Sequence, residues 1–280
     1  MQNNNIEYLK KDYFKSNYFE SKFGSSFKLV ETKQVFDLTN IFLEKLKSLF
    51  NLSCSLEEIC NLHHKLDENL KIYDQKFAIN KISTFFYDMP DIFKKKYIEL
   101  LKSQIRPVIG QDFYFQDNPT LRVQMPHITA EPMYPYFHSD IQLGHPPYEI
   151  NVWMPLNPPS NSEGHGFSIT SLKDSIDTFK KYNFDILKIS ENGGKDISNK
   201  LNSISKLQNF KYGNAVLFDT RCLHSTQVMK NHTRISVDVR ITPTDLFHKF
   251  NHNYQGIGRK GVIYKPGDGY NIKSIDNLNS

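Results

Sequence analysis

Phe137-His138-Ser139-Asp140 is the short stretch that decides how the rest of this 280-residue chain is interpreted. On an extended strand, side chains two residues apart point to the same face. His138 and Asp140 would therefore direct an imidazole and a carboxylate at one point in space. His224, far downstream, offers a second imidazole, and together the three side chains form a facial ligand set for a divalent metal with open coordination positions.

The sequence around His224 supports this interpretation. The segment 213–219 is typical of a turn followed by a buried strand, and His224 comes a few residues later. The segment 232–240 then alternates strictly, with apolar residues on one face and Arg234, Ser236, Asp238 and Arg240 on the other. A strand with such a polar face is typical of the inner wall of a barrel that binds an anion.

Together, His138-Ser139-Asp140, His224 and Arg234-Ile235-Ser236 resemble the HxD…H…RxS signature of the Fe(II)/2-oxoglutarate-dependent oxygenases. The interval from His224 to Arg234 is 234 − 224 = 10 residues, as that signature usually has. Segments 144–146 and 149–156 resemble the branch related to phytanoyl-CoA hydroxylase and the streptomycin-pathway oxygenases. The resemblance covers about residues 106–243. It is specific for the superfamily and uninformative about the substrate.

The resemblance implies Fe(II) held by His138, Asp140 and His224, with 2-oxoglutarate and O2 as co-substrates. Arg234 would bind the far carboxylate of 2-oxoglutarate, because its planar guanidinium matches a carboxylate and stays charged. Ser236 would add a hydroxyl on the same face. The expected remaining co-substrate wall consists of Gln124, Asn151 and Trp153. The alternative for Asn151 is an ordinary strand-ladder residue, and the alternative for Trp153 is a core aromatic.

The substrate-binding candidates are Arg122, His127, His145 and Arg240. Arg240 lies six residues beyond Arg234, roughly 20 Å along a strand, so we expect it at the cavity mouth or in a surface ion pair. His127 and His145, like His165, are equally compatible with ordinary hydrogen-bonded loop positions. The substrate is expected to be a small polar metabolite, such as a sugar, a sugar nucleotide or an amino acid, and an anionic group is compatible with the moderate basic excess.

Composition narrows the functional class. The formal net charge is +5 with no dense Lys/Arg block, which favours a solvated surface over a nucleic-acid-binding face. Three cysteines cannot form a disulfide framework, which indicates a reducing compartment. No secretory signal or membrane-length apolar stretch is found, so a cytoplasmic monomer or homodimer is expected.

The expected architecture is one α+β domain, mainly β, over residues 1–280. A helical N-terminal layer (1–105) would pack on an eight-stranded jelly-roll barrel, or double-stranded β-helix (106–243), with a wrapping tail at 244–280. Helices are predicted at 32–50, with Thr32 as N-cap, at 67–86 and at 91–105, where Pro107 lies just beyond the end. Residues 134–140 are expected as a strand. Residues 173–208 are expected as a partly helical insertion, either a flap over the substrate or a plain surface loop.

Three alternatives remain at this stage. A non-catalytic jelly-roll protein could hold a metal or ligand without oxidising anything. A nucleic-acid demethylase would need a basic stripe and a base-flipping pocket, and neither is identifiable. A zinc site built from Cys54, Cys60, His63 and His64 is disfavoured, because their spacing matches no standard zinc knuckle.

Overall fold

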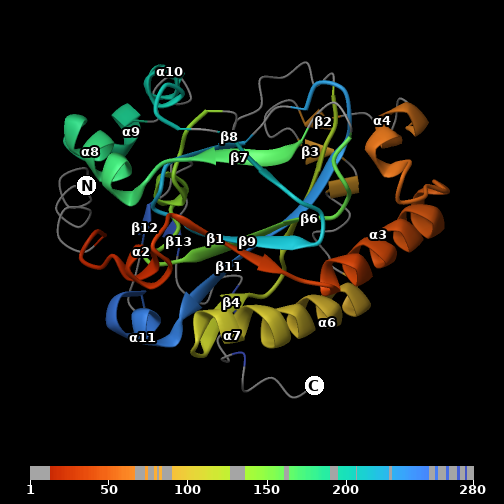
Figure 1. Ribbon diagram of the computed structural model, residues 1–280, viewed down its shortest axis with the longest axis horizontal. Helices are drawn as coiled ribbons and strands as arrows, with labels where there is room; N and C mark the ends of the chain where they lie inside the picture. Colours follow the sequence, from red (N-terminus) through yellow and green to blue (C-terminus); the bar gives the residue numbers. More distant parts are fainter. Residues whose placement is uncertain are drawn as a thin grey trace.

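Two antiparallel sheets, with helices packed outside the larger one, make up the core of the computed structural model (Figure 1). The structure describes residues 13–66, 73–74, 79–80, 82–83, 90–126, 136–160, 164–189, 195–205, 207–226, 229–251, 256–257, 263–264, 270–271 and 275. Among these residues, no helix combines the length and the apolar character needed to cross a membrane.

The larger sheet has seven strands in the order β1-β9-β6-β11-β4-β14, with β5 paired to β11. Its longest strand, β11, pairs antiparallel with both β5 and β6, so that Ser236 lies opposite Arg122 on one side and Pro155 on the other. The strands are β1 (Phe27–Glu31), β4 (Phe113–Gln116), β5 (Thr120–Gln124), β6 (Ile150–Pro155), β9 (Asn214–Asp219), β11 (Arg234–Pro243) and β14 (Tyr270–Asn271).

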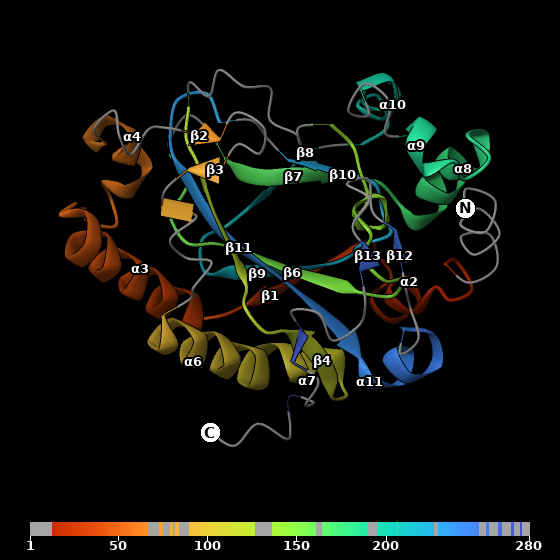
Figure 2. The same ribbon diagram turned by 180° about the vertical axis from the view of Figure 1, so that it is seen from behind.

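The smaller sheet has the order β10-β7-β8 and faces the larger one (Figure 2). Its strands are β7 (His165–Ile169), β8 (Leu207–Phe210) and β10 (His224–Thr226). An isolated bridge between His138 and His224 adds the metal-candidate segment to the free edge of β10. The mainly antiparallel fold is as predicted. Two facing antiparallel sheets with a helical layer match the predicted fold class, and within the described residues no ladder joins the edges of the short sheet to the long one, so the sheets do not close into a barrel.

The two faces of the larger sheet pack against different partners. The outward faces of β6 and β11 contribute Ile150, Val152, Ile235 and Val237 to the main core, where they meet helices α3 (Gln34–Phe50) and α6 (Asp91–Leu100). These helices lie against one outer side of the larger sheet in both ribbon views. The space between the sheets holds a separate cluster, which includes Trp153, Phe167, Phe210 and Phe218. The helical layer therefore leaves the inner face of β11 for the polar side chains.

The N-terminal layer contains strands that the sequence analysis missed. Segment 27–31 is not helical but forms β1, the edge strand beside β9. The predicted helix at 67–86 is also wrong, because its described residues include the two-stranded pair β2 (Tyr73–Asp74) and β3 (Ile79–Asn80). Tyrosine and isoleucine favour extended backbone, and no long apolar face recurs here to override that preference.

Two helix boundaries differ from the prediction. Helix α3 begins at Gln34, because Thr32 donates its backbone N–H to Gly213 O (2.8 Å) and so extends the β1 pairing instead of capping the helix. The helix that starts at Asp91 runs past Pro107, through a π-helical turn at Leu101–Ile105 into α7 (Arg106–Ile109). Pro107 sits in the first turn of α7, where its missing N–H costs little.

The insertion at 173–208 is partly helical, as predicted, and lies at one end of the smaller sheet. It packs through Phe179 and Ile197 on Tyr13, Phe137 and Leu223, close to the start of the His138 segment. The remaining elements are short: α2 (Tyr18–Phe23), a 3-10 turn (Ile59–Asn61), α4 (Leu62–Lys65), α8 (Leu172–Lys181), α9 (Ile186–Ile189), α10 (Lys195–Leu201), α11 (Thr244–Leu246), a π-helical turn (Phe247–Asn251), β12 (Gly256–Ile257) and β13 (Ile263–Tyr264).

Candidate metal centre

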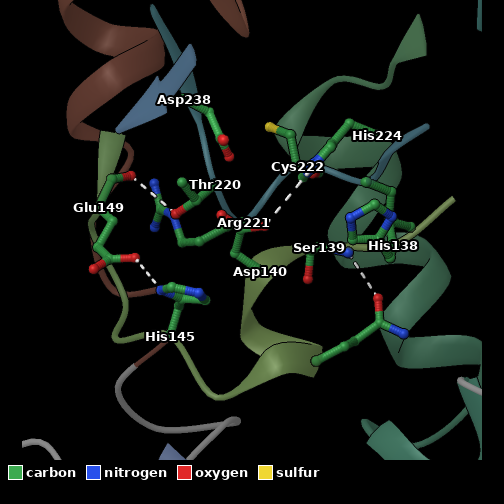
Figure 3. A network of polar contacts seen from close by, with 12 residues as sticks. His138, Ser139, Asp140, His145, Glu149, Thr220, Arg221, Cys222, His224 and Asp238 are labelled. Carbon is green, nitrogen blue, oxygen red and sulfur yellow. Dashed lines mark hydrogen bonds and ion pairs between the residues drawn. The ribbon is translucent and has the colours of Figure 1, made fainter. Parts of the chain in front are cut away.

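His138, Asp140 and His224 come together between the two sheets, and their nearest ligand atoms all lie within 4.8 Å of one another. The backbones of His138 and His224 exchange two hydrogen bonds, of 3.0 and 2.8 Å, which places their rings side by side with centroids 4.5 Å apart. Asp140 lies beside the two rings (Figure 3). Its Oδ1 is 3.7 Å from Nε2 of His224, which is too far for a direct hydrogen bond.

Asp140 reaches this position through a turn and not through a strand. It opens a 3-10 turn, Asp140–Leu143, and the strand predicted over 134–140 is absent from the described part of that segment, 136–140, where His138 makes only the isolated bridge. Ser139 donates its N–H to the side-chain oxygen of Gln142 (2.7 Å), and Asp140 donates its N–H to Thr220 O (3.1 Å). The bond from Ser139 to Gln142 favours a turn over a continuing strand, so the backbone leaves the extended path at Asp140.

Hydrogen bonds to the backbone fix the orientation of both imidazoles. Nδ1 of His138 lies 3.0 Å from Tyr136 O, and Nδ1 of His224 lies 2.9 Å from Cys222 O. A carbonyl oxygen accepts only from a protonated nitrogen, so each Nε2 carries the lone pair. Backbone partners of this kind hold metal-binding histidines in the required tautomer.

The protonation states also suit a cation. Burial lowers the pKa of His138 to about 3, and burial likewise lowers the pKa of His224, so both rings are neutral near pH 7. For Asp140, burial acts to raise the pKa, but the Arg240 guanidinium and the neighbouring imidazoles of His145 and His224 lower it below the usual range. Two neutral imidazoles and one ionised carboxylate are the forms in which these groups bind a metal, and the residues present therefore fit Fe(II) or a similar divalent ion.

An open cavity lies beside the three donors. Every second residue of β11, from Arg234 to Arg240, lines it, as strand alternation predicts. The other expected wall residues, Gln124, Asn151 and Trp153, line it as well. Oδ1 of Asn151 is buried and has no hydrogen-bond partner among the described residues. The cavity is thus lined by polar groups that are held in place from neighbouring strands.

Arg234 lies deep in this cavity, with only 2% of its surface exposed. Its Nη1 donates to Gly166 O on β7 (2.9 Å), and its Nη2 donates to the side-chain oxygen of Gln124. The guanidinium carbon lies 5.9 Å from the centre of the Trp153 ring. Both sheets therefore orient the cation, and Ser236 follows it on the same wall.

Arg240 does not lie at a surface ion pair or exposed mouth, as the sequence analysis expected. It is 6% exposed, and its Nε donates to Oδ2 of Asp140 at 2.8 Å. Its acidic neighbour is therefore Asp140, which lies over the C-terminal half of β11 and makes the ion pair a buried one. Arg122 lies nearer the opening, with its side chain 40% exposed, and forms a forked pair with Asp238 (3.1 and 3.2 Å).

The histidine candidates have other surroundings. Nδ1 of His145 lies 3.1 Å from Glu149 Oε2, on the far side of Asp140 from the two imidazoles, and His145 is not among the residues that line the cavity (Figure 3). His165 is buried, with Nε2 3.1 Å from Nε2 of His232. His127 lies outside the described residues.

Several cavity residues had no predicted role. They are Leu143, Gly166, Phe167, Phe218, Thr226 and Asp238. Only Asp238 carried a usable signal, because it shares the polar face of β11 with Arg234. Within the described ranges, His138, Asp140 and His224 form the single group of three or more metal-ligand side chains, and the disfavoured zinc cluster near Cys60 is not among such groups.

Comparison with protein-family models and with curated proteins gave no match. Among solved structures, the chain is similar to SnoK, described as a non-heme alpha ketoglutarate dependent carbocyclase from nogalamycin biosynthesis, with 9% identity over 94% of this chain and 88% of that one and a TM-score of 0.43. It is also similar to EctD from S. alaskensis with 2-oxoglutarate and 5-hydroxyectoine, with 11% identity over 87% and 79% and a TM-score of 0.49.

A third similar structure is SnoN, described as a non-heme alpha ketoglutarate dependent epimerase from nogalamycin biosynthesis, with 9% identity over 86% of this chain and 82% of that one and a TM-score of 0.39. Identities and TM-scores this low assign no role to any residue. The chemistry of the site therefore follows from its own side chains, which combine a three-donor metal site with a buried, oriented arginine on the wall of one cavity.

Proposed function

We propose that the protein is an Fe(II)- and 2-oxoglutarate-dependent dioxygenase that oxidises, by hydroxylation, a small polar metabolite. The observation that carries this proposal is the presence of His138, Asp140, His224 and Arg234 around a single cavity. The three donors would hold Fe(II). Arg234 would bind the far carboxylate of 2-oxoglutarate, with Ser236, Gln124, Asn151 and Trp153 as the rest of that subsite.

When bound, Fe(II) and 2-oxoglutarate would supply the oxidation, in which one oxygen atom of O2 is inserted into a substrate C–H bond and the other is incorporated into succinate, with release of CO2. The protein supplies orientation. Arg234 would fix one end of the diacid through its planar pair of N–H donors. Trp153 and Phe167 form an apolar part of the cavity wall, which would limit water around the reacting groups. The same residues would serve desaturation, epimerisation or ring closure.

A substrate with an anionic group fits the charges of the cavity. Arg122, Arg234 and Arg240 face it together with the carboxylates of Asp140 and Asp238. The arginines exceed the carboxylates by 3 − 2 = 1, and a bound Fe(II) would balance the two charges of 2-oxoglutarate. Arg122, the most exposed of the three, is the proposed contact for a substrate carboxylate or phosphate. A sugar nucleotide, a sugar acid or an amino acid would meet this requirement.

Anaerobic addition of Fe(II) and 2-oxoglutarate tests the proposal. We expect a weak visible charge-transfer band, followed by formation of succinate when air is admitted. Addition of the correct metabolite should raise succinate formation above the level seen without it. Asp140→Ala should abolish the band, and Asp140→Asn should do the same while keeping the side-chain shape if the first variant is unstable.

Asp177→Ala is the matched control. This carboxylate lies on the outer surface of α8, paired with Lys173, and its removal should leave the band unchanged. A non-catalytic barrel that only holds a ligand or metal would give neither band nor succinate with the native protein. That result would overturn the oxygenase proposal.

A further inference from the structure

Arg240 is the buried cation nearest to the carboxylate of Asp140. Its Nε donates to Oδ2 of Asp140 at 2.8 Å, while Oδ1 of Asp140 faces His224 Nε2 at 3.7 Å. The two carboxylate oxygens are therefore distinguished: one is engaged by the guanidinium and the other points toward the imidazole. A carboxylate without such a partner could rotate and offer either oxygen to the metal.

Two further carboxylates lie within ion-pair distance of Arg240. Nη1 lies 3.7 Å from Asp238 Oδ2, and Nε lies 4.0 Å from Glu149 Oε2. Glu149 is 1% exposed and lies beside His145, so Arg240 has buried carboxylate neighbours in addition to its hydrogen bond to Asp140. A planar fork with several fixed partners has little freedom to rotate.

We propose that Arg240 is a positioning residue that binds Oδ2 of Asp140 and so presents Oδ1 as the single carboxylate donor to the metal. This inference rests on the proposed function only in requiring that the three-donor site binds a divalent ion. It assigns Arg240 a role other than the substrate contact expected from its strand position. Arg240 acts on the ion through Asp140 and needs no contact with substrate.

Charge and orientation predict opposite effects when Arg240 is removed. Because a guanidinium repels a nearby cation, its loss would strengthen metal binding if charge alone mattered. If Arg240 positions Asp140, its loss releases the carboxylate and weakens metal binding, because groups that hydrogen-bond to metal ligands typically contribute 10–100-fold in affinity. The direction of the change therefore separates the two possibilities.

The experiment measures the affinity of the metal-free protein for Mn²⁺, by calorimetry, together with the visible spectrum of the Co²⁺-loaded protein. Arg240→Met should weaken Mn²⁺ binding about 10–100-fold and alter the Co²⁺ spectrum. Arg240→Lys keeps the buried charge but loses the planar fork, so its affinity should lie between those of the native protein and Arg240→Met. Unchanged or tighter Mn²⁺ binding in both folded variants would overturn the proposal.

The matched control is Arg221→Lys. Arg221 is also fully buried in a forked pair with an aspartate, Asp219, at 2.9 and 2.6 Å, but it does not contact Asp140. Its substitution should lower the melting temperature and leave Mn²⁺ affinity within about twofold. If Arg240→Met does not fold, Arg240→Lys decides alone, since a native-like affinity and Co²⁺ spectrum in that variant contradict a role for the fork. Failure of the native protein to bind Mn²⁺ at all would instead refute the metal site itself.

Discussion

Replacement of Arg234 by lysine tests whether this residue recognises the far carboxylate of 2-oxoglutarate. The native guanidinium is 2% exposed and is oriented by Gly166 O at 2.9 Å and by Gln124. A lysine ammonium keeps the positive charge, so the long-range attraction to the diacid remains. What it loses is the planar pair of donors that can engage both oxygens of one carboxylate.

The expected loss is that of one charge-assisted hydrogen bond, roughly 1.5–3 kcal/mol. At about 1.4 kcal/mol for each factor of ten, this weakens 2-oxoglutarate binding about 10–100-fold. Anaerobic titration of the Fe(II) protein, followed through the charge-transfer band, measures the Kd directly.

A second ligand makes this test specific to the far carboxylate. Pyruvate has the same 2-oxo acid group as 2-oxoglutarate but no far carboxylate, so Arg234→Lys should change its affinity by less than about twofold. This double cycle of protein and ligand isolates the interaction between the arginine and that carboxylate. Equal weakening for both ligands, or a native-like Kd for 2-oxoglutarate, would refute the assigned role.

Three further predictions concern the same cavity. Burial lowers the pKa of both His138 and His165 to about 3, below the value of roughly 6.5 in the unfolded chain, so the unfolded state binds more protons between these pH values. The metal-free protein should therefore lose about 2 kcal/mol of unfolding free energy per histidine from pH 7 to pH 5. Denaturant unfolding at both pH values measures this loss, and a pH-independent stability would contradict it. Gly166→Ala places a Cβ against the backbone carbonyl of Gln208, so it should cost about 1–3 kcal/mol of unfolding free energy and weaken 2-oxoglutarate binding. In the matched control, Gly164→Ala, the added Cβ meets only the side chain of Asn209, so the loss of unfolding free energy should be smaller. Ser236→Ala should weaken 2-oxoglutarate binding about 10–100-fold, the effect of one hydrogen bond to a charged carboxylate, with no change in Mn²⁺ affinity.

Much of the cavity wall could be predicted from sequence because β11 alternates without interruption. All ten of its residues are buried, yet Ile235, Val237, Val239 and Ile241 join the helical side while the polar residues between them face the cavity. Burial on both sides means that overall hydrophobicity could not separate the faces. The alternation of residue type separates them, because the apolar face meets helices and the polar face meets a ligand space.

Prediction failed where a segment depends on contacts with distant parts of the chain. The segment that forms β1 is half exposed and amphipathic, and it becomes a strand because β9 offers an unpaired edge. The pairing of sheet edges could not be predicted for a related reason, since the number of strands predicts neither their length nor which edges meet. Pro107 was expected to end a helix, yet the π-helical turn before it accommodates the ring.

The donor set shows how strand parity can bring candidate ligands together although the predicted strand is absent. Strand parity requires only that two side chains two residues apart point the same way, and Ser139 keeps an extended backbone that meets this requirement before the 3-10 turn begins at Asp140. The carboxylate of Asp140 then lies beside β11, where Arg240 donates to its Oδ2. Because that contact joins segments 100 residues apart, spacing within the motif predicts candidate ligands but not the arginine that contacts one of them.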